Sequence, residues 1–215
     1  EHGFTFINQF VHLTNHATDV AQEMKALKAA LDEPALTIPW SELLTAARWH
    51  DVGKAHEVFQ SMLVEPLPEN DLRRSGGPWA KSDHKKGRPN RKHFRHELAS
   101  ALVLLQHKES DLAAYLAAAH HGKVRLSIRS LPDEKMPADG KRFARGIWEG
   151  DPLPSVDLGD GVLTQALVLN LSFMEMGEGA HGPSWLERMI RLRDHYGPFK
   201  LAWMETLVRV ADWRG

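Results

Sequence analysis

The chain has 215 residues, of which 42% are hydrophobic, and its formal net charge is −1. This size and apolar content predict a single domain over residues 1–215 with a packed core, which excludes wholesale disorder. The near-zero charge argues against a protein that coats nucleic acid through its overall charge, so any basic surface must be local. The lack of cysteine excludes disulfides, thiolate zinc sites and a cysteine nucleophile, and it suits a reducing cytoplasm. No apolar run approaches the roughly 20 residues of a membrane span, so we expect a cytoplasmic protein with no membrane partner.

The N-terminal part of the chain predicts an amphipathic helix. Residues 10–31 carry apolar side chains at three- and four-residue spacing, which forms one hydrophobic stripe. His12 and His16 lie four residues apart, and both would therefore project from one face of this helix. Pro34 follows in an Asp-Glu-Pro sequence and is expected to end the helix, because proline cannot continue it.

The next segment contains the most informative motif in the sequence, Trp49-His50-Asp51-Val52-Gly53-Lys54. A second helix is predicted from Pro39 to His50, and helical structure is predicted to continue from Val52 to about Val64. The histidine offers a neutral nitrogen ligand, and the aspartate offers oxygens that can bridge two cations. The lysine adds a compact positive charge that suits a phosphate. The motif therefore predicts the centre of a metal site.

A basic loop follows. Residues 65–92 contain several prolines and glycines without an apolar period, which predicts a long irregular insertion. From Arg73 to Arg95 there are nine lysines and arginines and one acid, Asp83. Either this loop is simply a solvated surface, or it guides a phosphate backbone, with Trp79 available to stack on a base. The candidate nucleic-acid-binding residues are Arg73, Arg74, Lys85, Lys86, Arg88 and Arg91, together with Arg125 further along the chain.

The rest of the chain predicts an all-α fold. Further helices are predicted over residues 94–107, 110–121, 163–176, 185–196 and 199–213. Ser110 and Ser184 are suited to capping the start of two of them, and Gly122 and Pro198 mark helix boundaries. Residues 123–161 form a second irregular insertion, in which 124–128 alternate and could form a short strand or an extended arm.

Candidate metal ligands occur at five places in the chain. They are His16, His50 with Asp51, His96, His120 with His121, and Asp212. Imidazole and carboxylate ligands together suit manganese, iron, cobalt, nickel or zinc. Adjacent ligands on a helix point roughly 100° apart, so such a pair shares one cation only near a helix end, or binds two cations. Two metals with a bridging carboxylate are suited to phosphodiester hydrolysis.

Four ordered motifs resemble those of the HD nuclease domain of the CRISPR-associated type I helicase–nuclease. They are His50-Asp51-Val52-Gly53-Lys54, Phe94-Arg95-His96-Glu97, His120-His121-Gly122 and Ala211-Asp212-Trp213-Arg214. His16 resembles the first-helix histidine of that family. The resemblance spans nearly the whole chain and implies an HD-domain helical bundle with two insertions, about 65–92 and 123–161. Residues 120–129 and 197–202 look closest to subtype I-U/I-G.

This resemblance implies a role for each candidate residue. One metal would be held by His16, His50, Asp51 and Asp212, and the second by His96, His120 and His121, with Asp51 bridging. Asp51 and Lys54 would be catalytic, the lysine by contacting the scissile phosphate or the attacking water. Members of the family cut single-stranded DNA with two divalent transition-metal ions (manganese, cobalt, nickel or iron). They act with a helicase, in cis or in trans, that the CRISPR RNA-guided surveillance complex recruits.

Two other functions stay open at this point. The His-Asp-x-Gly-Lys run also occurs in HD phosphohydrolases that act on nucleotides or cyclic dinucleotides, although their Gly-Tyr-Pro signature is missing here. A non-catalytic docking module, stabilised by its metal, is the third reading. Among the other histidines, His12, His107 and His195 are expected to be structural, and His56 and His93 could support neighbouring motif residues.

Overall fold

The computed structural model describes residues 9–31 and 37–215. Helices dominate this part of the chain, as the sequence predicted. They are α1 (Leu13–Leu31), α2 (Trp40–Trp49), α3 (Glu57–Val64), α4 (His96–Gln106), α5 (Asp111–Ala119), α6 (Trp185–Tyr196) and α7 (Pro198–Arg214). Three-residue and four-residue 3-10 helices add η2 (Val52–Ala55), η3 (Leu72–Arg74) and η4 (Ser172–Met174).

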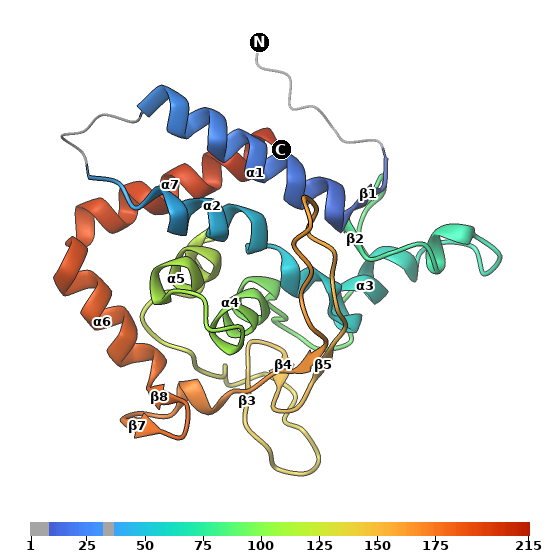
Figure 1. Cartoon of the computed structure of the whole chain (residues 1–215). Helices are drawn as coiled ribbons and strands as arrows, with labels where there is room; N and C mark the ends of the chain where they lie inside the picture. The colour runs from blue at the N-terminus through green and yellow to red at the C-terminus, as the bar shows by residue number, and fades with distance from the viewer. Residues whose placement is uncertain (1–8, 32–36) are drawn as a thin grey trace.

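The described strands are short and pair two by two, always antiparallel. The pairs are β1 (Val11–His12) with β2 (Trp79–Lys81), β3 (Phe143–Ala144) with β4 (Ile147–Trp148), β5 (Pro152–Leu153) with β6 (Leu167–Val168), and β7 (Glu178–Gly179) with β8 (Gly182–Pro183). None of these hairpins forms a core of its own, so the fold is a helical bundle with small β-hairpins at its edge (Figure 1).

Helices α4 and α5 form the centre of the bundle. Every residue from Glu97 to Leu105 and from Leu112 to Ala119 is buried, so both helices are enclosed by protein on all sides, as expected of core helices. Helix α5 contacts α2, α4, α6 and α7, while α1 lies beside α2 and α7 (Figure 1). The core positions of α1, such as Val20 and Met24, are fully buried by these neighbours.

The helix boundaries largely follow the predicted ones, with two corrections near the N-terminus. The first helix begins at Leu13 rather than at residue 10, because Val11 and His12 pair with β2; His12 is therefore not helical. The predicted stop at Pro34 lies outside the described residues. The predicted helix over Val52–Val64 is interrupted at His56, whose backbone is extended and whose Nδ1 accepts a hydrogen bond from the Val58 N–H (3.1 Å). His56 is therefore the N-cap of α3, and a new helix begins after it.

The second half of the chain contains the one wrong helix prediction. Residues 163–176 are extended apart from η4, and β6 pairs with β5. The buried hydrophobic side chains here are Leu169, Leu171 and Phe173, which occupy every second position as in a strand. The Leu169 N–H donates to the Asp151 carbonyl (2.8 Å), so the hairpin partner supplies the hydrogen bonds that a helix would have made internally. Residues 124–128 form no strand in this structure.

The loop between β5 and β6 is tied to the helical bundle by a buried arginine. The Arg48 guanidinium donates to the carbonyls of Leu158 (2.7 Å) and Gly159 (3.0 Å), and it pairs with the Asp160 carboxylate (2.6 Å). Gly159 has a φ of 79°, and a Cβ there would lie 2.1 Å from the Thr18 hydroxyl. Only glycine therefore fits this close approach to α1, which fixes the second insertion onto α1 and α2 (Figure 1).

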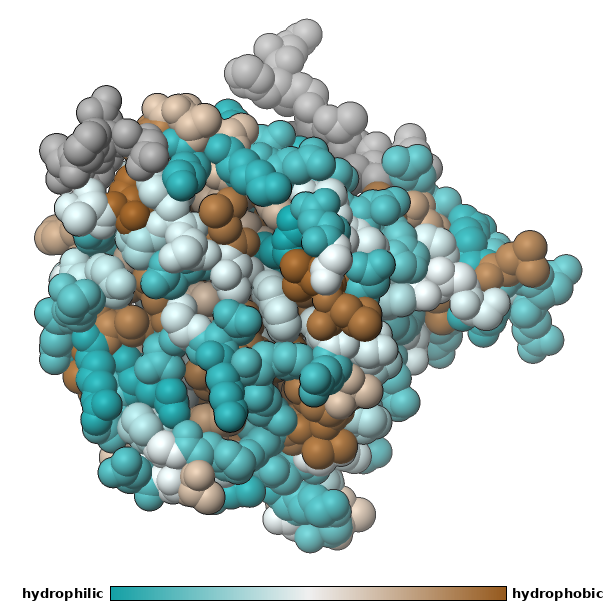
Figure 2. Space-filling model, viewed as in Figure 1, coloured by the Kyte–Doolittle hydropathy of each residue, from teal (hydrophilic) through white to brown (hydrophobic). Residues whose placement is uncertain are grey.

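The face drawn in Figure 2 is mostly hydrophilic, and its hydrophobic residues form small separate patches. The first insertion, residues 65–92, is irregular except for η3 and β2, as predicted. None of the described helices combines the length and the apolar content that a membrane crossing requires.

Candidate metal centre

The His50-Asp51 motif lies at the turn between α2 and η2. Helix α2 ends at Trp49 and η2 begins at Val52, and the side chains of both motif residues between them are buried inside the bundle. Gly53 allows η2 to touch α4: a Cβ at this position would lie 2.2 Å from the His96 carbonyl oxygen. The Gly53 N–H donates to the Ser100 hydroxyl (2.9 Å), which locks the same contact. The glycine thereby places His96, the first residue of α4, beside the motif.

One group of ligand atoms joins α1, the motif and α7. His16 Nε2 lies 3.0 Å from Asp51 Oδ2 and 3.3 Å from Asp212 Oδ1. His50 Nε2 lies 3.4 Å and 3.3 Å from the same two oxygens. The four ligand atoms all lie within 4.8 Å of one another, which is close enough for a single cation to contact them.

A second group lies on the other side of Asp51. It consists of His96 from the start of α4 and His120 and His121 from the end of α5, again with ligand atoms within 4.8 Å of one another. Asp51 Oδ1 lies 3.1 Å from His96 Nε2 and 3.9 Å from His120 Nε2. The Asp51 carboxylate thus faces the first group with Oδ2 and the second group with Oδ1.

The donor atoms fit a metal site because they are buried and otherwise unpaired. Within the described residues, the Nε2 atoms of His16, His50, His96 and His120 and the Oδ1 atom of Asp51 are buried without a hydrogen-bond partner. Each such group costs about 1–3 kcal/mol when left unsatisfied. The Nδ1 atoms of His50 and His120 lie 2.8 Å and 2.6 Å from the carbonyls of Ala47 and Ala117. A proton on Nδ1 donates to that carbonyl and leaves the Nε2 lone pair free for a cation.

The protein charges around this site favour a cation. Burial disfavours the charged form of His50, but the carboxylates of Asp51 and Asp212 raise the pKa of His50 to about 10. Burial also opposes charge on Asp51, yet His50 and Lys54 hold the pKa of that carboxyl well below its usual range. In the second group, burial lowers the pKa of His96 to about 4. The carboxylates of the group around His16 and His50 therefore favour a nearby positive charge. In the other group, His96 is a neutral imidazole at neutral pH.

Lys54 extends the motif toward the edge of the site. Its ammonium contacts Asp51 Oδ2, and its side chain is buried. The same ammonium lies 5.6 Å from the centre of the Phe59 ring, and that ring packs against His96 with centroids 5.4 Å apart. Lys54 is thus a fixed positive charge at the ligand cluster.

Most of the arginines proposed to bind nucleic acid make contacts within the protein. Arg73 pairs with Asp71 (2.6 Å) and Asp83 (3.0 Å), and Arg74 donates to the backbone carbonyls of Val64 and Leu67. Arg91 pairs with Asp151 and stacks on Trp148, and Arg125 pairs with Glu205. By contrast, the structure shows no ion pair for Lys85, Lys86 or Arg88 among the described residues. The arginines hold the insertions in place, which leaves the free positive charge mainly on lysines.

Two supporting residues, Lys81 and Glu97, were not predicted as members of the site. Lys81 of β2 is half-buried within the electrostatic reach of Asp51 and Asp212. Glu97 is fully buried beside His96, with Oε2 3.6 Å from His96 Nδ1, and burial raises its pKa. Lys81 lies in a three-residue strand, which is too short for its alternation to predict a position near the site. Glu97 was noted in the sequence only as part of the motif that contains His96.

His56 connects the motif to the second insertion. Its Nε2 lies 3.2 Å from Asp151 Oδ2, and Asp151 also pairs with Arg91 and accepts from the Trp148 N–H (2.8 Å). Burial tends to raise the pKa of Asp151, but the hydrogen bonds of His56 and Arg91 bring it below its usual value. The side chain of His56 therefore holds α3 and the second insertion, rather than contacting a residue of the motif as its position suggested.

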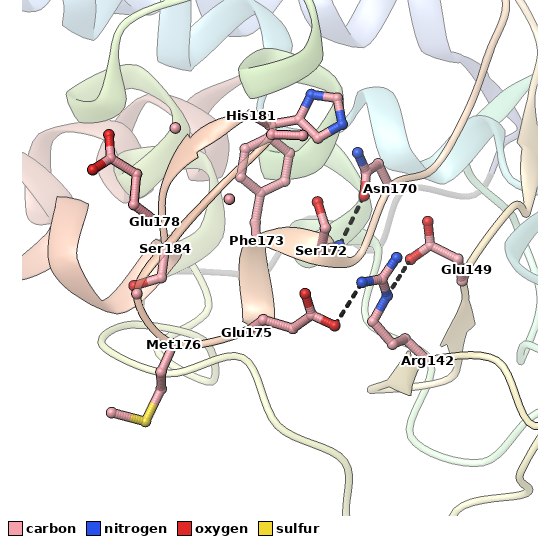
Figure 3. A pocket seen from close by; sticks show the side chains of 14 residues that line it. Arg142, Glu149, Asn170, Ser172, Phe173, Glu175, Met176, Glu178, His181 and Ser184 are labelled. Atoms are coloured by element: carbon pink, nitrogen blue, oxygen red, sulfur yellow. Dashed lines mark hydrogen bonds and ion pairs between the residues drawn. The ribbon is translucent and has the colours of Figure 1, made fainter.

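A cavity of about 440 Å³ lies elsewhere, around η4 and the β7–β8 hairpin. Figure 3 shows Arg142 in this cavity between Glu149 and Glu175, with bonds of 3.0 Å and 2.6 Å to their carboxylates. Its lining contains none of the candidate metal ligands. The Arg142 guanidinium is occupied by these two carboxylates, and no group of candidate metal ligands among the described residues lies in this cavity.

Comparison with known proteins gives a family match. A family model described as "Cas3, HD domain" matches residues 7–215. The matched range includes every residue of the two histidine–carboxylate groups. No match was found among the curated proteins or among the solved structures.

Proposed function

The chain belongs to the Cas3 HD domain family, and from that membership we propose that it is a metal-dependent nuclease that hydrolyses single-stranded DNA. The observation that carries the proposal is the position of the Asp51 carboxylate, with one oxygen facing each histidine group. A carboxylate shared in this way suits a pair of cations at a phosphodiester. Phosphodiester hydrolysis is the reaction class that the family implies.

The ligands divide between two divalent transition-metal ions (manganese, cobalt, nickel or iron). His16, His50, Asp51 and Asp212 would hold the first. His96, His120 and His121 would hold the second, and Asp51, which lies beside both groups, would be shared between the two ions. When bound, the ions supply an activated water and neutralise negative charge on the phosphate.

The side chains of the protein have separate tasks in this reaction. Asp51 orients both groups of ligands, and its buried position excludes competing hydrogen bonds from solvent. Lys54, whose ammonium is already at the ligand cluster, would bind a non-bridging oxygen of the scissile phosphate as charge builds up there. Gly53 keeps α4 close enough for His96 to join the centre.

The family also suggests the setting of this activity. We infer that the chain acts with a helicase, fused or separate, which an RNA-guided CRISPR surveillance complex recruits to a displaced DNA strand. In such a system the guide RNA selects the target, so the nuclease itself needs no sequence preference. Residues 120–129 and 197–202 support a place in subtype I-U/I-G, and a cytoplasmic location agrees with DNA as the substrate.

The direct test uses circular single-stranded DNA, which offers no ends to an exonuclease contaminant. With Mn²⁺, the parent protein is expected to degrade it, and Asp51→Asn to lose the activity. Asp194→Asn is the matched control, because Asp194 is exposed and, among the described residues, pairs only with the neighbouring Arg193. Equal cleavage by the parent and Asp51→Asn would assign the activity to a contaminant and refute the proposed site.

Two further measurements separate this proposal from the alternatives. A panel of mononucleotides and cyclic dinucleotides is assayed beside the DNA, and turnover of these compounds alone would favour an HD phosphohydrolase. Elemental analysis of protein purified without chelators or nickel resin reports the bound metal. Bound metal without hydrolysis of any nucleic acid or nucleotide would favour the docking module.

A further inference from the structure

Lys81 and Lys86, two lysines of the first insertion, have no counter-ion among the described residues, unlike most of its arginines. Arg73, Arg74 and Arg91 are held by carboxylates or backbone carbonyls. Within the described part of the chain, no ion pair or hydrogen bond occupies the ammonium groups of Lys81 and Lys86. A cation that the fold leaves unpaired next to a buried reaction centre is available for an anionic ligand.

Lys86 shares an aromatic ring with the motif lysine. Its ammonium lies 4.7 Å from the centre of the Phe59 ring, and the Lys54 ammonium lies 5.6 Å from the same centre. The loop that carries it is fixed, because the Gly87 N–H donates to the Met62 carbonyl at 2.8 Å. Since the Phe59 ring also packs against His96, Lys86 is positioned at the border of the metal centre.

Lys81 approaches the same centre from β2. Gln60 ties this strand to the motif, because its amide nitrogen donates to the carbonyls of both Lys54 (2.7 Å) and Trp79 (2.9 Å). Lys81 pairs with Val11, which lies just before the helix that carries His16. The neighbouring Ala80 is buried in the core, so Lys81 projects from the opposite face of the strand, where it is half-buried.

The electrostatic surroundings agree with this placement. Removal from solvent lowers the pKa of Lys81, and Lys54 lowers it further, while Asp212 and Asp51 act in the opposite direction. Removal from solvent likewise lowers the pKa of Lys86, with Lys54 adding to the effect. The charges of Lys54 and Asp51 in the motif therefore act on the pKa of both lysines. An anion bound beside either lysine would relieve its repulsion from the Lys54 ammonium.

We propose that Lys81 and Lys86 form, with Lys54, a basic rim that binds the phosphodiester groups next to the one being cut. The proposal rests on the nuclease function above and specifies its substrate: a chain of several linked phosphates rather than a single phosphodiester or mononucleotide. Lys54 serves the scissile phosphate, and the other two lysines hold its neighbours. The rim thereby fixes the register of the backbone without reading the bases.

The test measures DNA binding separately from cleavage. Lys81→Gln, Lys86→Gln and the double variant are compared with Lys135→Gln, an exposed lysine of the second insertion without an ion pair in the described structure. Binding of a fluorescent single-stranded oligonucleotide is followed by anisotropy across a salt series without added metal. Each rim substitution is expected to weaken binding about tenfold. Each is also expected to reduce the salt slope by about 0.7 per lost phosphate contact, with no change for Lys135→Gln.

Cleavage assays with Mn²⁺ complete the test. The rim variants are expected to cut the oligonucleotide with a raised KM but to hydrolyse bis-p-nitrophenyl phosphate, which has a single phosphodiester, at the parent rate. Lys54→Gln is expected to slow both substrates. An unchanged Kd and salt slope in a folded double variant would overturn the rim, as would an equal loss in Lys135→Gln. If the parent itself cuts neither substrate, the nuclease function fails, while the anisotropy data still decide whether the rim exists.

Discussion

Gly53→Ala is the most informative single substitution, because the structure predicts the sign of its effect. A Cβ at this position would lie 2.2 Å from the His96 carbonyl oxygen and 2.7 Å from both Ala99 Cβ and Ser100 N. These atoms belong to the α4 backbone or to a short side chain, so none can rotate away. In an open site, replacing glycine by alanine stabilises a protein by about 0.4–1 kcal/mol through the unfolded state. Here η2 and α4 must separate by about 1 Å, and such overpacking costs about 1–3 kcal/mol.

The separation also moves a metal ligand. His96 starts α4, so a shift of about 1 Å at its carbonyl displaces its imidazole from Asp51, and misplacements of that size can reduce a rate about 100-fold. Urea unfolding measures the stability, and cleavage of circular DNA with Mn²⁺ measures the rate. Gly179→Ala is the matched control, since no atom lies within 4 Å of its Cβ position and its φ is not left-handed. A Gly53→Ala protein as stable and as active as the parent would show that the motif glycine does not set the η2–α4 distance.

Three further predictions concern stability and metal binding. Arg48→Ala removes the hydrogen bonds to the turn at residues 158–160, and urea unfolding is expected to show a loss of about 2–3 kcal/mol in the free energy of unfolding. The control Arg193→Ala, which changes an exposed arginine, is expected to lose less than about 0.5 kcal/mol in the same assay. Mn²⁺ at about 100 times its Kd is expected to increase the free energy of unfolding by about 2.7 kcal/mol and to raise Tm by about 5–10 °C, and EDTA should reverse both effects. The Asp51→Asn variant is expected to lose most of this rise in Tm. The pKa of Asp151 is lower in the folded protein than its usual value of 3.8. The ionised carboxylate therefore contributes fully to the free energy of unfolding above pH 3.8, and this contribution disappears as the pH falls through the folded pKa. The gap in unfolding free energy between the parent and Asp151→Asn should therefore narrow below that pH, and a gap that is constant from pH 6 to pH 3 would contradict the assignment.

Local sequence signals were sufficient for most of the helices. Helix α6 begins after Ser184, whose hydroxyl accepts from the Glu187 N–H (3.3 Å), as its capping pattern predicted. The helix predicted over residues 163–176 failed, because leucine-rich sequence has similar local preferences in a helix and in a buried extended strand. The partner strand β5, which is distant in sequence from most of this segment, decided between them.

For the candidate metal centre, the sequence alone determined the chemistry: imidazole and carboxylate ligands, a lysine beside them and an ordered set of motifs. Tertiary structure decided which oxygen of Asp51 faces which histidines, with Oδ2 facing His16 and His50 and Oδ1 facing His96. It also decided which basic residues stay free, since the partners of Arg73 and Arg91 are set by how the insertions fold back on the bundle. The physical reason is that side-chain chemistry is a property of each residue. Distances between residues on α1, α2, α4, α5 and α7 exist only once the core has brought those helices together.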